Sequence, residues 1–134
     1  MTFTRHFNFP KNFVYSQGIG IVDDNDLRIH VLSFQMESKG MTHVRELLDF
    51  CRLEKADKLT VQGLIEICDL EKKRSEDRDF RLAILVDKPF VAKFAEIYAQ
   101  LVKTRNLKVT VIHDSLDDAL GWLGYDDDEK RRLK

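Results

Sequence analysis

The pattern of apolar and polar positions begins with two predicted strands. Phe3, Phe7 and Phe9 occupy odd-numbered positions, and residues 13–22 are rich in β-branched and aromatic side chains. Alternation with a period of two is typical of a strand that buries one face. The polar segment 8–12, which contains a proline, separates the two stretches. We therefore predict that the chain opens with an antiparallel hairpin.

Four later stretches show the spacing of amphipathic helices. The acidic residues 23–26 offer N-cap side chains and negative charge to the first helix, and Thr60 and Ser115 can cap the second and the fourth. On the second helix we expect Glu66 and Glu71 to face water. The apolar positions of the four predicted helices are, in order, Leu27, Val31 and Phe34; Val61, Leu64, Ile65, Cys68 and Leu70; Phe90, Phe94, Tyr98 and Leu101; and Leu116, Ala119, Leu120 and Leu123.

Three more strands are predicted between these helices. Residues 44–50 and 109–112 are short apolar-dominated runs, and residues 82–86 are an unbroken apolar run. An unbroken run of strand length is typical of a central parallel strand that is covered by helices on both faces. We expect the charged segment 52–58 to be a loop.

The resulting order of elements predicts one α/β domain. Two strands are followed by helix, strand, helix, strand, helix, strand and helix, and right-handed crossovers would make the later strands parallel. We expect a mixed sheet of about five strands with four helices. The domain should span residues 1–124, and residues 125–134 should form a charged, solvated tail.

Composition narrows the possible functions and locations. The 134 residues contain 43% hydrophobic and 34% charged side chains with a formal net charge of -1, so there is no overall basic field for nucleic acid. Residues 1–11 lack the apolar stretch of a signal peptide, and no segment approaches the length of a membrane-spanning helix. We therefore expect a cytosolic protein.

Cysteine and histidine residues show no pattern that would hold a metal ion. Cys51 and Cys68 are far apart in the sequence and form no CxxC pair, so we expect reduced thiols and no disulfide. The histidines at positions 6, 30, 43 and 113 have no spacing typical of metal ligands. No metal and no cofactor are expected.

Polar residues at strand ends are the candidates for catalysis. Arg52, Asp87, His113 and Asp114 should lie at the carboxyl ends of parallel strands, where open α/β sheets bind ligands. In an enzyme such as a small hydrolase, His113 would act as a base oriented by one of the aspartates. Since the sequence has no recognisable nucleophile motif or oxyanion loop, we favour a protein without catalytic activity.

The predicted helix from Pro89 to Arg105 is more apolar than one buried stripe requires. Its surplus apolar surface could form a homodimer seam, one wall of an apolar pocket, or a transient contact with anionic lipid. The alternative is a helix that lies deeper in the core. The pocket hypothesis places this helix opposite the helix that follows Thr60. The candidate ligand-binding residues are then Leu64, Ile65, Cys68, Phe90, Phe94 and Tyr98.

Four segments resemble the SpoIIAA-like, or STAS-like, bacterial domains. They are the glycine and acidic turn at 18–24, the strand at 46–52, the strand at 81–86, and the segment 114–123 with its closing Ala-Leu-Gly-Trp-Leu. The resemblance spans roughly residues 3–124 and implies a binding or regulatory module with a SpoIIAA-like fold.

The same resemblance implies two kinds of function. STAS domains antagonise anti-sigma factors and are switched by phosphorylation at the start of the second core helix, a position that falls near Thr60 here. This chain has Asp57-Lys58-Leu59-Thr60-Val61 where the family has a small Asp-Ser-Gly-like turn. The related CRAL-TRIO fold encloses apolar ligands such as lipids. A small apolar ligand, a protein partner and a membrane surface are therefore all possible targets.

Overall fold

A five-stranded mixed sheet forms the framework of the described residues, which are 2–75, 77–104 and 106–134 of this computed structural model. The strands lie side by side in their order along the chain. β1 is antiparallel to β2, and β2 to β5 are mutually parallel. The predicted α/β class, the opening hairpin and the parallel later strands are confirmed. The strands are β1 (Thr2–Asn8), β2 (Phe13–Asp23), β3 (His43–Lys58), β4 (Asp79–Val86) and β5 (Leu107–His113).

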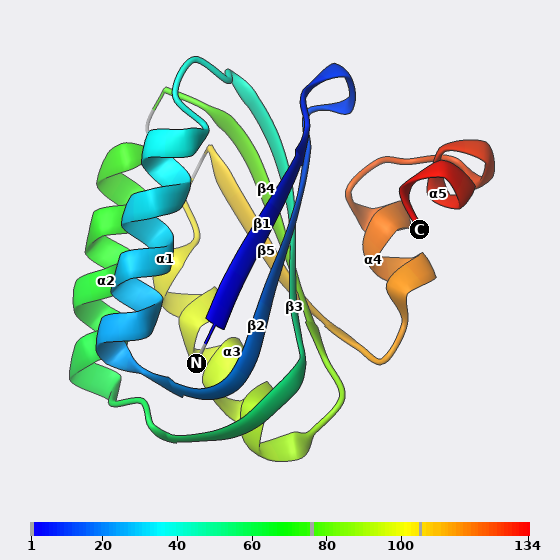
Figure 1. Ribbon diagram of the computed structural model, residues 1–134. Coiled ribbons are helices and arrows are strands. Elements are labelled where there is room, and N and C mark those ends of the chain that lie inside the picture. The colour runs from blue at the N-terminus through cyan, green and yellow to red at the C-terminus, as the bar shows by residue number, and fades with distance from the viewer. Residues whose placement is uncertain (1, 76, 105) are drawn as a thin grey trace.

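Helices cover both faces of the sheet (Figure 1). Right-handed crossovers between consecutive neighbouring strands place the first three helices on one face. The last two helices lie on the other face, at the right of the view. The helices are α1 (Asp24–Glu37), α2 (Val61–Arg74), α3 (Pro89–Val102), α4 (Leu116–Trp122) and α5 (Asp127–Leu133). The predicted end of the third helix at Arg105 lies outside the described residues.

The predicted count of four helices was wrong, because the described residues contain five α-helices. The additional one, α5, forms in the segment that we expected to be a solvated tail. Asp126 caps it through a reciprocal pair of hydrogen bonds with Glu129, and Leu133 packs against the core below α4. Lys130 forms an ion pair with Asp117 of α4, with 3.1 Å between Nζ and Oδ2.

Alternating side chains of the sheet divide the interior into two cores. In β4, Phe80, Leu82, Ile84 and Val86 face α1 to α3, whereas Ala83 and Leu85 face α4 and α5. The larger core, under α1 to α3, contains most of the buried aromatic and aliphatic residues. The predicted burial of this strand on both faces is therefore confirmed.

Segment 52–58 is a strand and not the predicted charged loop. It continues β3 to Lys58 and pairs with β2 as far as Asp23. The register shifts three times along this stretch, so that two residues of β3 oppose one of β2 at each bulge. The bulges bring Leu53 and Ala56 onto the same buried face, although they are three positions apart. The charged side chains between them remain exposed.

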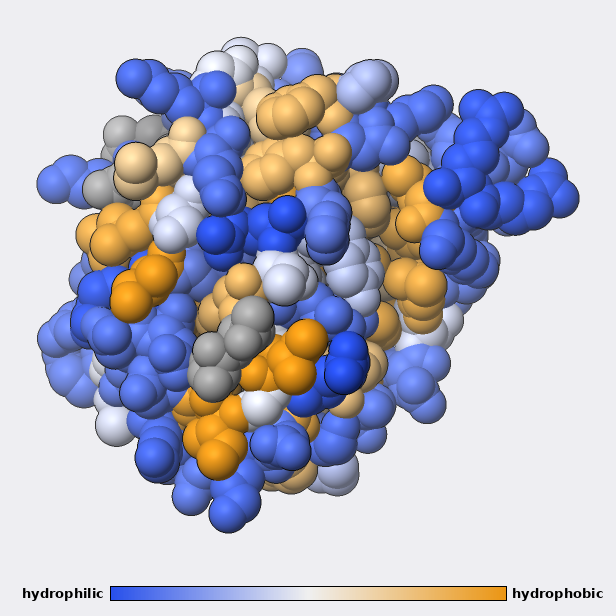
Figure 2. Space-filling view, viewed as in Figure 1, coloured by the Kyte–Doolittle hydropathy of each residue, from blue (hydrophilic) through white to orange (hydrophobic). Residues whose placement is uncertain are grey.

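The surface is mostly hydrophilic, with separate apolar patches on the face shown in Figure 2. The exposed large apolar residues include Ile29 and Met36 of α1, Val61 and Ile65 of α2, and Phe90 of α3. In the part of the chain that the structure describes, no helix combines the length and the apolar character needed to cross a membrane.

Candidate functional site

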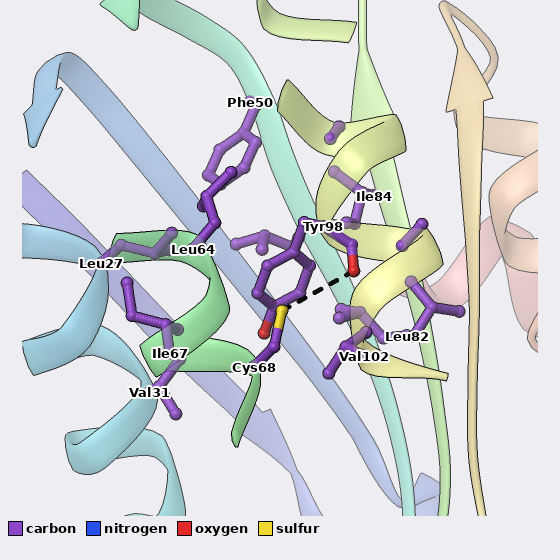
Figure 3. Packing of buried hydrophobic residues seen from close by; sticks show 14 of the residues in the cluster. Leu27, Val31, Phe50, Leu64, Ile67, Cys68, Leu82, Ile84, Tyr98 and Val102 are labelled. Atoms are coloured by element: carbon purple, nitrogen blue, oxygen red, sulfur yellow. Dashed lines mark hydrogen bonds between the residues drawn. The ribbon is translucent and has the colours of Figure 1, made fainter. Parts of the chain in front are cut away.

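A cavity lies inside the larger core, between the sheet and helices α1, α2 and α3. We call it the inner cavity. Its volume is about 30 Å³, which is room for one or two water molecules. Figure 3 shows Leu64 of α2 near Phe50 and the ring of Tyr98 of α3 near Cys68, in the core between the helices and the sheet. The lining residues are Leu27, His30, Val31, Phe34, Glu46, Leu48, Phe50, Leu53, Ala56, Leu59, Leu64, Glu71, Leu82, Ile84, Val91, Phe94, Ala95 and Tyr98.

A second, larger depression lies on the surface next to the inner cavity. This surface hollow has a volume of about 410 Å³ and is formed by the extension of β3 and the first turns of α3. Ala56 and Phe94 line both the hollow and the inner cavity. Phe94 is the larger of the two and is partly buried, so its side chain lies at the boundary between the two spaces. The remaining residues of the hollow are Glu54, Lys55, Asp57, Phe90 and Lys93.

Two carboxyl groups are buried among the apolar residues of the inner cavity. Glu46 of β3 and Glu71 of α2 are each only 3% exposed. The Nε2 atom of His30 lies 3.3 Å from Oε2 of Glu46. Glu71 accepts a hydrogen bond from the Gln35 amide, at 3.5 Å, and another from the Tyr98 hydroxyl. We call these five residues the acceptor cluster.

The hydrogen bonds of His30 fix its tautomer. Its Nδ1 atom lies 3.2 Å from Nη1 of Arg5, and a guanidinium group can only donate. Nδ1 therefore accepts, and Nε2 carries the proton that is donated to Glu46. His30 is thus an uncharged donor. Arg5 also donates a hydrogen bond to Glu37, with 3.3 Å between Nη2 of the arginine and Oε1 of the glutamate.

Burial favours the neutral forms of Glu71 and Tyr98 in the acceptor cluster. Loss of water, followed by repulsion from Glu46, raises the pKa of Glu71 from 4.5 to about 8. Burial and the neighbouring Glu71 raise the pKa of Tyr98 well above its usual value. Glu71 is therefore largely protonated at neutral pH, since charge is costly in this apolar setting.

The six residues predicted to bind a ligand fall into three positions. Leu64, Phe94 and Tyr98 line the inner cavity, so that α2 and α3 form two of its walls. Cys68 is buried beside it, with its Sγ atom 3.9 Å from the carbonyl oxygen of Tyr98 (Figure 3). Ile65 is 36% exposed, and Phe90 is 43% exposed and lines the surface hollow only.

The sequence analysis missed the polar half of this site. It assigned Glu71 to the water-facing side of α2. The structure corrects this assignment, because Glu71 is buried. Glu71 stands seven residues after Leu64 and three after Cys68, spacings that place it on the buried side. Glu46 lies on the same face of β3 as Val44 and Leu48, each two residues away. That period of two would have identified Glu46 as a buried residue.

Comparison with known proteins identifies the fold. No protein-family model and no curated protein matches this chain. Among solved structures, it is similar to an uncharacterized protein of the DUF3478 family from Shewanella loihica, described as having a SpoIIAA-like fold. The match covers 91% of this chain and 92% of that chain, with a TM-score of 0.59 and 14% sequence identity. The fold is SpoIIAA-like. At this level of identity the match establishes the fold alone.

Within the SpoIIAA-like fold, Thr60 is the N-cap of α2, as predicted from the sequence. Its hydroxyl accepts a hydrogen bond from the Gly63 amide and donates one to Asp24 of α1, at 2.6 Å. The Thr60 amide also donates to Asp24. The carboxylate of Asp24 therefore occupies the amino end of α2, where a phosphate on Thr60 would lie. Phosphorylation of Thr60 stays a prediction, and it would break this link between α1 and α2.

The strand-end residues considered for catalysis have other partners in the SpoIIAA-like fold. His113 is the last residue of β5 and lies 3.5 Å from Glu96 of α3, measured from Nε2 to Oε1. Asp87 forms an ion pair with Lys88, with 2.9 Å between Oδ1 and Nζ. Asp114 is exposed and has a left-handed backbone, with φ 52°. The carboxylate beside His113 therefore belongs to Glu96 and not to Asp87 or Asp114, which the sequence analysis considered as its partners.

Proposed function

We propose that this protein is a non-catalytic binding module that takes a small, largely apolar ligand into the inner cavity. The observation that carries the proposal is the position of Phe94, which separates the inner cavity from the surface hollow. Outward rotation of this single side chain would join the two spaces. The hollow alone, at about 410 Å³, lies within the size range of small-molecule sites.

The walls on either side of Phe94 also support a ligand site. The inner cavity is lined mainly by aliphatic and aromatic side chains with a few polar groups at one end, which is the usual composition of such sites. The SpoIIAA-like fold is consistent with a binding or regulatory role. A cavity of about 30 Å³ holds no lipid chain while Phe94 is in place, so binding requires the side chain to move.

A charged residue in place of Phe94 is expected to prevent binding of an apolar probe. We expect Phe94→Glu to weaken the binding of the neutral dye N-phenyl-1-naphthylamine at least about tenfold, because a carboxylate at the entrance opposes the passage of an apolar molecule. Dye fluorescence titration measures the affinity, and thermal melting reports the fold. Since Phe94 is only partly buried, the cost in stability should be about 1–3 kcal/mol.

Met36→Glu is the control for that experiment. Met36 is 76% exposed on α1 and lines neither the inner cavity nor the surface hollow. The variant should melt and bind the dye like the wild type. The proposal is contradicted if the wild-type protein binds no dye and Phe94→Glu melts far below it, since Phe94 would then be ordinary core.

The absence of catalysis is part of the proposal and has its own test. Because His113 pairs with Glu96 at the surface, we expect His113→Ala to leave ligand binding within about twofold of the wild type. Dye titration of the variant measures this. Reproducible hydrolase turnover that disappears in His113→Ala would instead support the small-hydrolase alternative.

The predicted homodimer remains a proposal, and α3 exposes less apolar surface for it than the sequence analysis expected. The buried residues of α3 include Val91, Ala95, Tyr98 and Val102, so most of the surplus that we attributed to a seam belongs to the core. Phe90 is the large apolar residue of α3 that is left exposed. Location in the cytosol and transient contact with a membrane likewise stay predictions.

A further inference from the structure

When Glu71 is ionised, the acceptor cluster contains more hydrogen-bond acceptors than donors. The two carboxyl groups and the Gln35 amide together offer five oxygen atoms. The direct partners that the structure describes for the carboxyl groups are His30, Gln35 and Tyr98, which are all uncharged donors. The Oε1 atom of Gln35 is buried and has no hydrogen-bond partner among the residues that the structure describes. Gln35 as a whole is only 5% exposed.

From this excess of acceptors we propose that the ligand carries a primary amine, and that its ammonium group binds between Glu46 and Glu71 at the inner end of the cavity. The inference rests on the proposed function, since it names the polar end of a ligand in the same cavity. An ammonium group provides three donors and one positive charge, which are what the cluster lacks. A buried polar group without a partner is costly, so the ligand would relieve a deficit of the free protein.

The surroundings of Glu71 favour a cation over an anion. The groups that face it are Glu46 from β3, Gln35 from α1, Tyr98 from α3 and Arg78 from the segment after α2. Arg78 is the cation in this set, and its Nη1 atom donates to the Ser38 hydroxyl at 2.7 Å. A carboxylate or phosphate ligand would meet two acidic side chains at short range, whereas an amine would be attracted by both.

The distance from the acceptor cluster to Phe94 sets the length of the proposed ligand. Tyr98 is one helical turn beyond Phe94 on α3, which is about 6 Å along the helix axis. An unbranched alkyl chain of about eight carbons would therefore lead from the ammonium group past Phe94 into the surface hollow. The residues along that path include Leu64, Leu53 and Ala56, all of them buried and apolar.

Binding of the ammonium group should release a proton from Glu71. In the free protein this carboxyl group is largely protonated at neutral pH, because its pKa is raised to about 8. The ammonium group pairs with the carboxylate form, so the proton leaves to solvent while the ligand keeps its own. The affinity should therefore rise with pH, by up to about tenfold per pH unit below pH 8.

The test compares three ligands with the same chain. Octylamine, 1-octanol and octanoate are titrated into the full chain by calorimetry at pH 6, 7 and 8, in pairs of buffers with different ionisation enthalpies that report proton release. We expect octylamine to bind at least about tenfold more tightly than 1-octanol at pH 8, because hydrogen bonds with charged groups are the stronger class. Octanoate should bind least.

Three variants separate the contribution of the carboxyl groups from that of the cavity. Glu71→Gln and Glu46→Gln should each lower the affinity for octylamine more than the affinity for 1-octanol, and so remove the preference for the amine. Glu66→Gln, an exposed site on the same helix, should retain the preference and so control for attraction by surface charge. Thermal melting of each variant confirms folding, and Glu71→Gln alone suffices if Glu46→Gln does not fold.

The outcomes distinguish this inference from the proposed function. Equal binding of octylamine and 1-octanol by wild type and Glu71→Gln would overturn the amine inference and leave the apolar site standing. A preference for octylamine that persists in Glu71→Gln would also overturn it. If none of the three compounds nor the neutral dye binds, the proposed function itself fails.

Discussion

Replacing Glu71 with glutamine is expected to stabilise the folded protein, by an amount on the order of 3 kcal/mol at pH 8 and above. Glu71 is 3% exposed, and its pKa is raised from 4.5 to about 8 by burial and by Glu46. Glutamine has nearly the same shape but carries no charge. Its amide also offers N–H donors to a cluster that is rich in acceptor oxygens, which the carboxylate does not.

The pH dependence of that difference follows from proton linkage. Below about pH 4.5 the carboxyl group is protonated in both the folded and the unfolded chain, so wild type and variant should differ little. Between pH 4.5 and 8 the folded state binds more protons than the unfolded state, so the wild-type free energy of unfolding falls as pH rises. The advantage of Glu71→Gln should therefore grow across this range and level off above pH 8.

Urea denaturation at pH 4.5, 6, 7 and 8.5 measures this prediction. Glu66→Gln is the matched control, because it makes the same substitution at an exposed position of α2 and should change stability by less than about 0.5 kcal/mol. A Glu71→Gln variant that is less stable than wild type at pH 8.5 would mean that the carboxylate has a compensating partner. A variant that gains stability but loses amine binding would show that the cluster is maintained for function at a cost in stability.

The course of β3 shows where prediction from sequence succeeds and where it fails. Residues 44–50 alternate between the two faces, and they form the strand that this pattern predicts. Beyond Phe50 the bulges break the period of two, so that buried Leu53 and Ala56 are three residues apart. The pairing with β2 that allows this is a tertiary contact, which the sequence of β3 does not contain. The charged residues at 54, 55, 57 and 58 therefore suggested a loop.

Charge also misled the assignment of α5 and of Glu71. Charged residues are usually exposed, and this expectation placed both outside the core. In α5 the charges are indeed exposed, but the capping box at Asp126 and the contact of Leu133 are enough to hold a short helix. In α2 the helical spacing would have placed Glu71 on the buried side, but its charge led to the exposed side being predicted. A carboxyl group at a position that the helical spacing places in the core is thus a better indicator of this site than the apolar residues around it.

The aromatic residues of α3 were predicted as a single strip, and the structure divides them. Val91, Ala95 and Val102 occupy the centre of the buried face, and Tyr98 shares it. Phe90 and Phe94 are at its edge. The buried positions are occupied by small or β-branched residues because α3 crosses close to β3, β4 and β5. The larger aromatic rings are therefore displaced toward the opening of the cavity, where Phe94 separates the two spaces.

Truncating Leu64 should destabilise the protein strongly and create a cavity that accepts a small apolar molecule. Leu64 is 1% exposed and forms the α2 wall of the inner cavity. We expect Leu64→Ala to lower the free energy of unfolding by about 2–5 kcal/mol, because apolar contacts are lost and the space left behind does not fully collapse. For a domain of this size the melting temperature should fall by roughly 5–20 °C.

The neighbouring residue provides the control, and an added ligand provides the decisive readout. Ile65→Ala removes a side chain of the same size from the next position of α2, but Ile65 is 36% exposed, so the loss should be below about 1 kcal/mol. Benzene at millimolar concentration should raise the melting temperature of Leu64→Ala and leave that of Ile65→Ala unchanged, because only the first variant has a site for it in the folded state. Equal destabilisation of the two variants, or no response of Leu64→Ala to benzene, would mean that α2 collapses onto the sheet. In that case the wall opposite Phe94 is too compliant to hold the inner cavity open around a ligand.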